Sequence, residues 1–313
     1  MTSYHGASVG TALTYPLSGL VIASFGWESV FYIIGSLSCL WCIAWWLLAY
    51  NTPSDHPRIS EKEKIYLEEH LGKSLSTKES SSLKTPWKNI FYSRPFWAVL
   101  VASQGLMWGS ITLSMQMPTY FFAVHNLDIK TNGLVSGIPD LSKFIFGLMF
   151  SSLMDHLLKK EILSITATRK ISVAVCEYLP AFLLIILAWI GTENAVVAAA
   201  LLSFATAVGG ASSSGSLANI VDLSPNFAGT ILGLIKVLTF IPGVLSPMIV
   251  SLLQSHVEKD MVWTYVFSML TCVYTLCCTV FLIFGSGEVQ SWNEPKDLPV
   301  AELEELVSSK AKC

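Results

Sequence analysis

Long apolar runs without a single charged residue are the feature that most restricts what this chain can fold into. Residues 31–50 and residues 195–221 each contain no Asp, Glu, Lys or Arg. Runs of about 20 such residues are typical of helices that cross a bilayer. Over the whole chain 52% of residues are hydrophobic and 13% are charged, where soluble domains average about 25% charged. The pattern predicts an integral membrane protein in a lipid bilayer, and it excludes a soluble enzyme, a disordered chain and a DNA-binding domain.

Eight apolar runs are long enough to span the membrane, which predicts an all-α integral membrane fold. The expected spans are about 5–24, 28–49, 95–122, 133–158, 171–191, 195–221, 228–252 and 263–285. Six of the seven cysteines fall inside these runs and the last one ends the chain, so we expect no disulfide framework. The net charge of −3, with no basic cluster on a soluble segment, predicts no nucleic-acid partner.

The basic residues predict how the spans are oriented. Of the 19 Lys and Arg residues, 15 lie in the 50–94 loop, in the 159–170 loop and in the tail after 285. These segments share one side if the spans alternate, and the other side then has only Lys130 and Lys259. Because cytosolic loops are enriched in Lys and Arg, we expect both chain termini to be cytosolic.

The 50–94 loop is the one sizeable polar segment, and we interpret it as a solvated linker between two groups of spans. Residues 58–70 are predicted to form a charged surface helix, because Ser60 and Glu63 have the spacing of a capping box. The Ser- and Lys-rich stretch that follows is typical of a flexible connection.

Four ionisable residues lie inside expected spans, where a charge is costly and is therefore a functional candidate. Asp140 and Lys143 are three residues apart, just after Pro139, and share a helix face about 15 Å into their span. Two interpretations stay open: a substrate or ion site, or an ion pair that only neutralises its own charges. Lys236, about 12 Å into its span, is either a counter-charge for a carboxylate or phosphate or a side chain that snorkels to the surface. Glu177, about 9 Å in, is expected to be structural or interfacial.

Residues 209–215 read Gly-Gly-Ala-Ser-Ser-Ser-Gly, and we expect the glycines mainly to allow close helix packing. The segment is no phosphate loop, because it lacks the lysine and the preceding strand of that motif. The chain contains no nucleophile elbow, no H-E-x-x-H motif and no four-ligand zinc spacing. We therefore predict no catalytic residue, no bound metal and no cofactor, and hence no enzyme.

Several short motifs follow one another along essentially the whole chain. They are Gly6-Ala-Ser-Val-Gly-Thr11 with Pro16-Leu-Ser-Gly19, Gly26-Trp27 with Val30-Phe31-Tyr32, Thr52-Pro53 with His56-Pro57-Arg58-Ile59-Ser60, Pro86-Trp87, Pro118-Thr-Tyr120, Asn132-Gly133, Ile138-Pro139, Asn219-Ile-Val-Asp222-Leu-Ser-Pro225-Asn-Phe-Ala-Gly229, Ile241-Pro-Gly243 and Ser286-Gly-Glu-Val-Gln-Ser-Trp292. In this order they resemble the anion:cation symporter family of the major facilitator superfamily. That family includes sialin, the vesicular glutamate transporters and the sodium–phosphate cotransporters.

The resemblance implies a helical bundle of twelve spans, of which this sequence corresponds to spans 5–12. Residues 1–49 would then be the last two spans of the N-terminal bundle, 50–94 the cytosolic linker, 95–285 the six-span C-terminal bundle and 286–313 a cytosolic tail. The family's main anion-binding arginine and proton-coupling residues belong to spans that precede this sequence. We therefore expect a partial gene model or a truncated isoform, with further N-terminal helices needed for a complete transporter.

The implied function is secondary active transport of a small organic or inorganic anion, coupled to H⁺ or Na⁺ by alternating access. The membrane would be the plasma membrane or a lysosomal or vesicular one. The resemblance places Lys236, Ser214 and Asn219 at the central cavity, with Lys143 and Asp140 as further substrate-binding candidates. It also suggests that Asp155 caps a neighbouring helix and stabilises one conformation. The alternative is a truncated, non-transporting membrane protein with a binding or scaffolding role.

Overall fold

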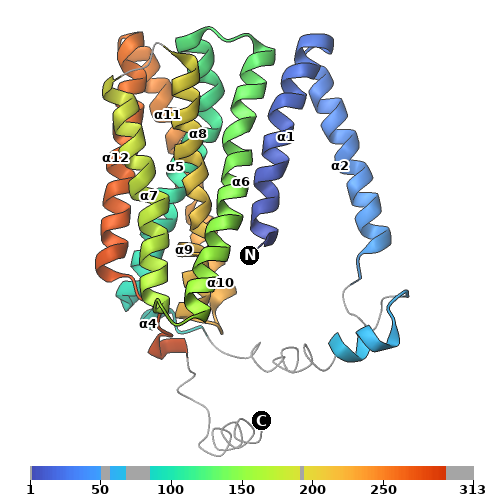
Figure 1. Cartoon of the computed structure of the whole chain (residues 1–313), viewed down its shortest axis with the longest axis vertical. Helices are drawn as coiled ribbons and strands as arrows, with labels where there is room; N and C mark the ends of the chain where they lie inside the picture. The colour runs from blue at the N-terminus through green and yellow to red at the C-terminus, as the bar shows by residue number, and fades with distance from the viewer. Residues whose placement is uncertain (1, 51–56, 68–84, 191–193, 294–313) are drawn as a thin grey trace, which may run out of the picture. The chain divides into compact units, whose positions relative to one another are not determined.

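The computed structural model describes residues 2–50, 57–67, 85–190 and 194–293, and every regular element in these ranges is a helix (Figure 1). The elements are α1 (Thr2–Phe25), α2 (Glu28–Leu48), α4 (Trp87–Tyr92), α5 (Arg94–His125), α6 (Ile129–Lys159), α7 (Ile165–Ile190), α8 (Ala195–Val208), η3 (Gly209–Ser213), α9 (Ser216–Leu223), α10 (Ala228–Leu238), α11 (Phe240–His256), α12 (Lys259–Phe284) and η4 (Ser291–Asn293).

The described residues contain eight helical segments long and apolar enough to cross a membrane, which confirms the expected all-α membrane fold. They are Gly6–Phe25, Glu28–Leu48, Arg94–His125, Ile129–Lys159, Ile165–Trp189, Ala195–Leu223, Ala228–His256 and Met261–Phe284. A helix satisfies all its backbone hydrogen bonds internally, which is what a bilayer demands of a spanning segment.

The chain divides into two units, residues 1–26 with 87–293 and residues 27–86 with 294–313. In the second unit α2 buries none of its side chains, and residues 61–67 form the helix expected in the polar loop. Ser60 caps that helix, because its Oγ accepts a hydrogen bond from the backbone N–H of Glu63 at 3.2 Å. The rest of the expected loop helix, residues 68–70, lies outside the described residues. The assignment of 1–49 and 95–285 to two transporter bundles stays a prediction.

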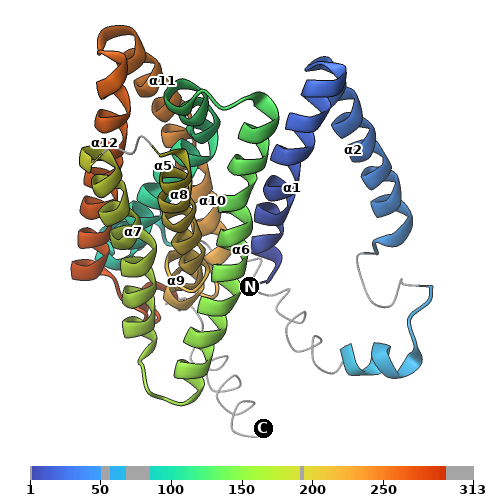
Figure 2. The ribbon, with the colours of Figure 1, turned by 45° about the horizontal axis from the view of Figure 1, so that its top comes forward.

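The first unit is a bundle in which α5 contacts most of the other helices. α7 packs along α12, α12 along α5, and α6 along α8, as the two ribbon views show (Figure 2). Large apolar side chains of α5, α7, α8 and α12, among them Phe121, Leu184, Leu202 and Leu270, form the main core. The burial of such side chains stabilises each by about 1.5–3 kcal/mol.

One end of this bundle carries its densest group of basic residues, and we call it the basic end. It contains Lys159, Lys160, Arg169 and Lys170, around the turn from α6 to α7. The segment after α12 returns to the same end: the N–H of Gly287 donates to Thr166 Oγ1 at 3.0 Å, and that of Gln290 donates to Leu223 O at 2.9 Å. The spans of the bundle therefore alternate in direction, as the charge distribution predicts.

Two spans of the bundle are interrupted near their middle. The span 195–223 changes from α8 into the 3₁₀ turn η3 and then into α9. A methyl group on Gly210 would lie 2.6 Å from the carbonyl oxygen of Lys143 and 2.9 Å from Cα of Gly147, so this glycine serves close packing, as expected. The span 228–256 breaks at Thr239, whose N–H bonds to the carbonyls of both Ile235 and Lys236. Interrupted spans are common at the binding sites of transporters.

α1 lies along α6 at very short distance (Figure 1). A methyl group on Gly133 would lie 2.8 Å from Tyr15 O, and one on Gly137 would lie 2.8 Å from Ala12 O and 2.9 Å from Pro16 Cδ. Only glycine permits this approach at both positions, and small residues four apart are a usual device for it in membranes.

Candidate functional site

Lys143 lies at the centre of α6 and is the best-placed cation for a ligand at mid-depth. Its Nζ donates one hydrogen bond, to Ser110 Oγ on α5 at 3.3 Å. The side chain is half-buried between α6, α5 and η3, where its Cε would lie 3.9 Å from a methyl group on Gly209. An ammonium group has three N–H donors, so two remain for a ligand or water. The turn η3 packs against α6 at Lys143 and Gly147, beside this cation.

Asp140 lies near Lys143, but the two side chains do not form an ion pair in the described part of the chain. Asp140 is 7% exposed, and its carboxyl group makes no hydrogen bond within the described residues. It does lie within electrostatic range of Lys143 and of Tyr15 on α1. Tyr15 in turn donates from its hydroxyl to Ser114 O on α5 at 2.5 Å. Lys143 extends toward α5, where it bonds to Ser110, and both interpretations of Asp140 and Lys143 stay predictions.

These residues form one group, which we call the α1–α5–α6 cluster. Its members are Tyr15, Ser110, Ser114, Asp140 and Lys143. It joins three helices that are far apart in the sequence, at the middle of α5 and α6. The sequence indicated Asp140 and Lys143, whereas Ser110, Ser114 and Tyr15 have no charge or motif that would single them out.

Lys236 occupies a different setting, one turn before the interruption of its span. Its side chain is exposed on the surface of α10. Thr239 Oγ1 donates to Lys236 O at 2.6 Å, and Gln104 Nε2 donates to Ile235 O at 3.3 Å. Hydrogen bonds from Thr239 and from Gln104 of α5 thus hold the backbone at Ile235 and Lys236, while the Lys236 side chain is exposed.

Ser214 and Asn219 lie inside the bundle, toward the basic end. Ser214 Oγ donates to Ser151 Oγ at 3.1 Å. Asn219 is 0% exposed and its Nδ2 donates to Ser286 O at 2.7 Å, while its Oδ1 has no partner in the described structure. In this conformation both side chains contact protein groups, so their assigned role in substrate binding stays a prediction.

Asp155 is exposed on the last turn but one of α6, and its side chain makes no hydrogen bond or ion pair with the described residues. A different ion pair, between Arg169 and Asp222, joins two helices at the basic end. The sequence indicated Arg169 only as a charge of the 159–170 loop, and Asp222 only as part of a family motif. Opposite charges at the same end of two spans are the signal that could have indicated this pair.

Glu177 lies much deeper than the sequence suggested. α7 begins at Ile165 instead of about 171, so Glu177 is about 18 Å from the helix start and at its middle. The helix thus includes Arg169, which is paired with Asp222 of α9. Glu177 is 1% exposed, which fits the structural alternative of the expectation and not the interfacial one.

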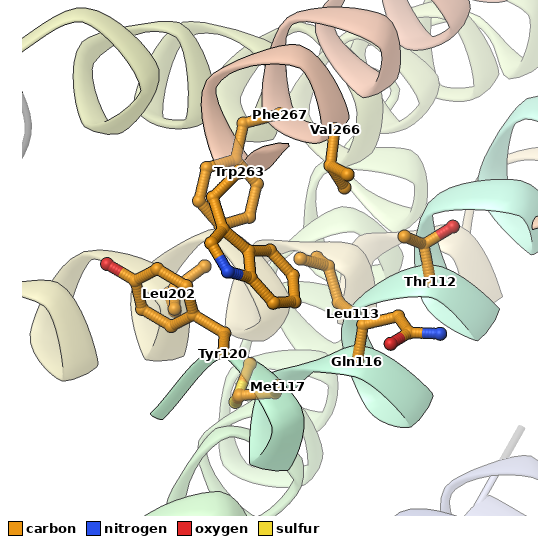
Figure 3. A pocket seen from close by; sticks show the side chains of 9 residues that line it. All are labelled: Thr112, Leu113, Gln116, Met117, Tyr120, Leu202, Trp263, Val266 and Phe267. Carbon is orange, nitrogen blue, oxygen red and sulfur yellow. The ribbon is translucent and has the colours of Figure 1, made fainter. Parts of the chain in front are cut away.

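A small apolar pocket lies toward the opposite end of the bundle (Figure 3). Tyr120, Trp263 and Phe267 line it, and the ring of Tyr120 contacts the other two edge to face. Thr112 and Gln116 also line it and add polar groups. Its lining contains no charged residue. An anion would lack a counter-charge there, so this pocket does not suit the substrate class that the sequence indicates.

Long apolar helices, two interrupted spans and charged side chains at mid-depth define a multi-pass α-helical membrane protein. The pattern of the Major Facilitator Superfamily matches residues 3–247, and the chain belongs to that superfamily.

The relatives of the chain are of the anion:cation symporter type. It is 36% identical over 300 residues to a Drosophila ananassae protein named "Putative inorganic phosphate cotransporter", covering 94% of this chain and 61% of the relative. It is 33% identical to vesicular glutamate transporter 3 of Danio rerio and 32% identical to vesicular glutamate transporter 2 of Homo sapiens, each time over 95% of this chain and 50% of the relative. The chain thus spans about half to three-fifths of the length of these relatives.

Proposed function

We propose that this protein takes part in the secondary transport of a small anion, such as phosphate or an organic carboxylate, with Lys143 as the anion ligand. The observation that carries the proposal is the Lys143 ammonium at mid-depth, which has a single hydrogen bond, to the neutral hydroxyl of Ser110. Relatives named for phosphate and for glutamate, both anions, support the substrate class.

The electrostatics of the α1–α5–α6 cluster favour an anion that exchanges with solvent. A cation in low dielectric attracts an anion far more strongly than in water. The two remaining donors of Lys143 match the oxygen atoms of a phosphate or a carboxylate. Asp140, on the same helix, partly balances the charge when no anion is bound, which keeps the empty site stable.

Transport would follow alternating access, in which two groups of helices rock around a mid-membrane site. The short-distance contact of α1 with α6 brings Tyr15 to the cluster, so a movement of α1 would change the surroundings of Lys143 directly. Coupling to H⁺ or Na⁺ belongs to this proposal, as do cytosolic termini, a basic end facing the cytosol, and a plasma, lysosomal or vesicular membrane. The proposal also includes a role of Asp155 in stabilising one of the two conformations of the transport cycle.

The test uses the purified chain in lipid vesicles, with radiolabelled phosphate and glutamate measured for both binding and uptake. We expect Lys143→Ala to weaken anion binding by about 10- to 100-fold, the range for losing a charge-assisted hydrogen bond. Lys143→Arg should retain part of the affinity, because it keeps the charge. Lys88→Ala, which removes an exposed lysine from α4, is the matched control and should bind as wild type.

Lys236→Ala distinguishes the two candidate cations in the same assay. A loss confined to Lys236→Ala would move the site to the α10–α11 break and contradict the role of Lys143. Equal anion binding by wild type and Lys143→Ala would also contradict the role of Lys143. Anion binding without uptake would favour the alternative of a membrane protein that only binds.

A further inference from the structure

Glu177 is a carboxyl group buried in the middle of the bundle, and nothing in the α1–α5–α6 cluster uses it. It is 1% exposed, and neither Oε1 nor Oε2 has a hydrogen-bond partner in the described structure. Buried polar atoms in native proteins nearly always have partners, so two unpartnered oxygen atoms on one side chain need an explanation.

The carboxyl group lies beside two glycines of α5. A methyl group on Gly105 would lie 3.6 Å from Oε1 of Glu177 and 2.8 Å from Sγ of Cys277. One turn along α5, a methyl group on Gly109 would collide with the hydroxyl group of Tyr274. The bare backbone of α5 at these two glycines therefore provides the room for Cys277 and Tyr274 of α12, and Glu177 of α7 lies beside them.

The groups around Glu177 offer no counter-charge. α12 presents Tyr274, Cys277 and Cys278, α7 itself presents Cys176, and α5 presents glycine at the point of contact. Lys143 is the nearest cation on α6, and its electrostatic partner on this side is Cys176, the residue before Glu177. No residue of η3 is ionisable.

A carboxylate without a counter-charge or a hydrogen bond is too costly to bury, and such a group takes up a proton instead. We infer that Glu177, in the space beside Gly105 and Gly109, is a proton-binding site, holding a neutral carboxylic acid in this conformation. Release of the proton to water leaves a carboxylate, so it requires α5, α7 and α12 to separate enough to admit solvent.

Such a site would couple proton movement to the rocking of the bundle, and this coupling role rests on the proposed transport function. Proton binding favours the closed packing of the three helices, and deprotonation favours the opened one. A ligand shifts an equilibrium only by its different affinity for the two states, and here the proton is that ligand.

The first experiment examines proton binding without any transport. Infrared spectra of the reconstituted full chain should contain a protonated-carboxyl band that persists above about pH 6, where exposed Asp and Glu are ionised. The band should disappear in Glu177→Gln, a nearly isosteric change, and stay in Glu63→Gln, the exposed control. The variant Asp140→Asn shows how much of the band comes from Asp140, whose carboxyl group also lies within the bundle. A band that titrates with the exposed carboxyls, or that survives in Glu177→Gln, would overturn the inference.

The second experiment measures coupling in vesicles. Glu177→Gln should reduce phosphate uptake driven by a pH gradient by about tenfold or more, while phosphate exchange without a gradient stays near the wild-type rate. Equal gradient-driven uptake would overturn the coupling role. If wild type transports nothing, the proposed function fails, and the infrared result still decides whether Glu177 binds a proton.

Discussion

Arg169 of α7 and Asp222 of α9 form a two-point ion pair at the basic end of the bundle. The distance from Arg169 Nε to Asp222 Oδ2 is 2.6 Å, and that from Nη2 to Oδ1 is 3.3 Å. Nη1 also donates to Ser214 O at 2.8 Å. The guanidinium group therefore joins α7 both to α9 and to the residue that follows η3, and it stabilises the interrupted span.

We predict that Arg169→Ala destabilises the protein by about 3 kcal/mol, because it leaves the carboxylate of Asp222 partly buried and unpaired. Both side chains are largely buried, with 11% and 19% exposure. Arg169→Lys should recover only part of the loss, since Lys cannot form the two-point contact. Thermal unfolding in detergent measures both variants. An Arg169→Lys protein as stable as wild type would contradict the role of this geometry.

The contact of α1 with α6 predicts that Gly137→Ala is destabilising. The added methyl group would lie 2.8 Å from a backbone oxygen of α1, and a backbone cannot move aside cheaply. Overpacking of this kind costs about 1–3 kcal/mol. Gly10→Ala on α1 is the matched control, because a methyl group there meets nothing within 4 Å. Thermal unfolding should rank Gly137→Ala below wild type, and Gly10→Ala equal to or above it.

Asp128 predicts a pH dependence of stability at the turn before α6. Its side chain caps α6 by accepting from the N–H groups of Lys130 and Thr131, each at 3.2 Å. The hydrogen bond from the Thr131 side chain, followed by that from its backbone, lowers the pKa of this carboxyl group below its usual value. A lowered folded-state pKa means that the cap stabilises the protein above the unfolded pKa, about 3.9, and loses this effect as pH falls through the folded one.

Thermal unfolding between about pH 6 and pH 3 measures this effect. Asp128→Ala should be less stable than wild type at the upper end, and the difference should shrink toward the lower end. Asp128→Asn keeps a capping oxygen without the charge and should change less with pH. A difference between wild type and Asp128→Ala that grows as pH falls would refute the assignment.

Asn293 predicts how the segment after α12 is held. Its Oδ1 accepts from Ser224 Oγ at 2.8 Å and from the N–H of Asn226 at 3.0 Å. Asn293→Ala leaves the buried hydroxyl group of Ser224 without this acceptor, which costs about 1–3 kcal/mol, whereas the exposed Asn226 can bond to water. Asn293→Asp keeps an acceptor at the same place and should remain close to wild type in thermal unfolding. Equal loss in both variants would show that the amide group itself is needed.

The spans and their alternation could be predicted from the sequence, because a bilayer leaves an apolar run of about 20 residues little choice except a helix. The capped helix of the polar loop was also predictable, since Ser60 and Glu63 interact within one turn. Local rules of this kind depend only on neighbours in the chain. They also indicated Lys143 and Asp140, because a charge in an apolar run is conspicuous.

The partners of those charges depended on the tertiary structure. Lys143 contacts Ser110, 33 positions away, and Arg169 contacts Asp222, 53 positions away. Glu177 lies deeper than expected because α7 starts at Ile165, before the apolar run begins. The sequence by itself determined which segments lie in the membrane, since this follows from the solvation of each segment alone. Only the packing of distant helices decided which charges are paired and which polar groups are buried without a partner in the described structure.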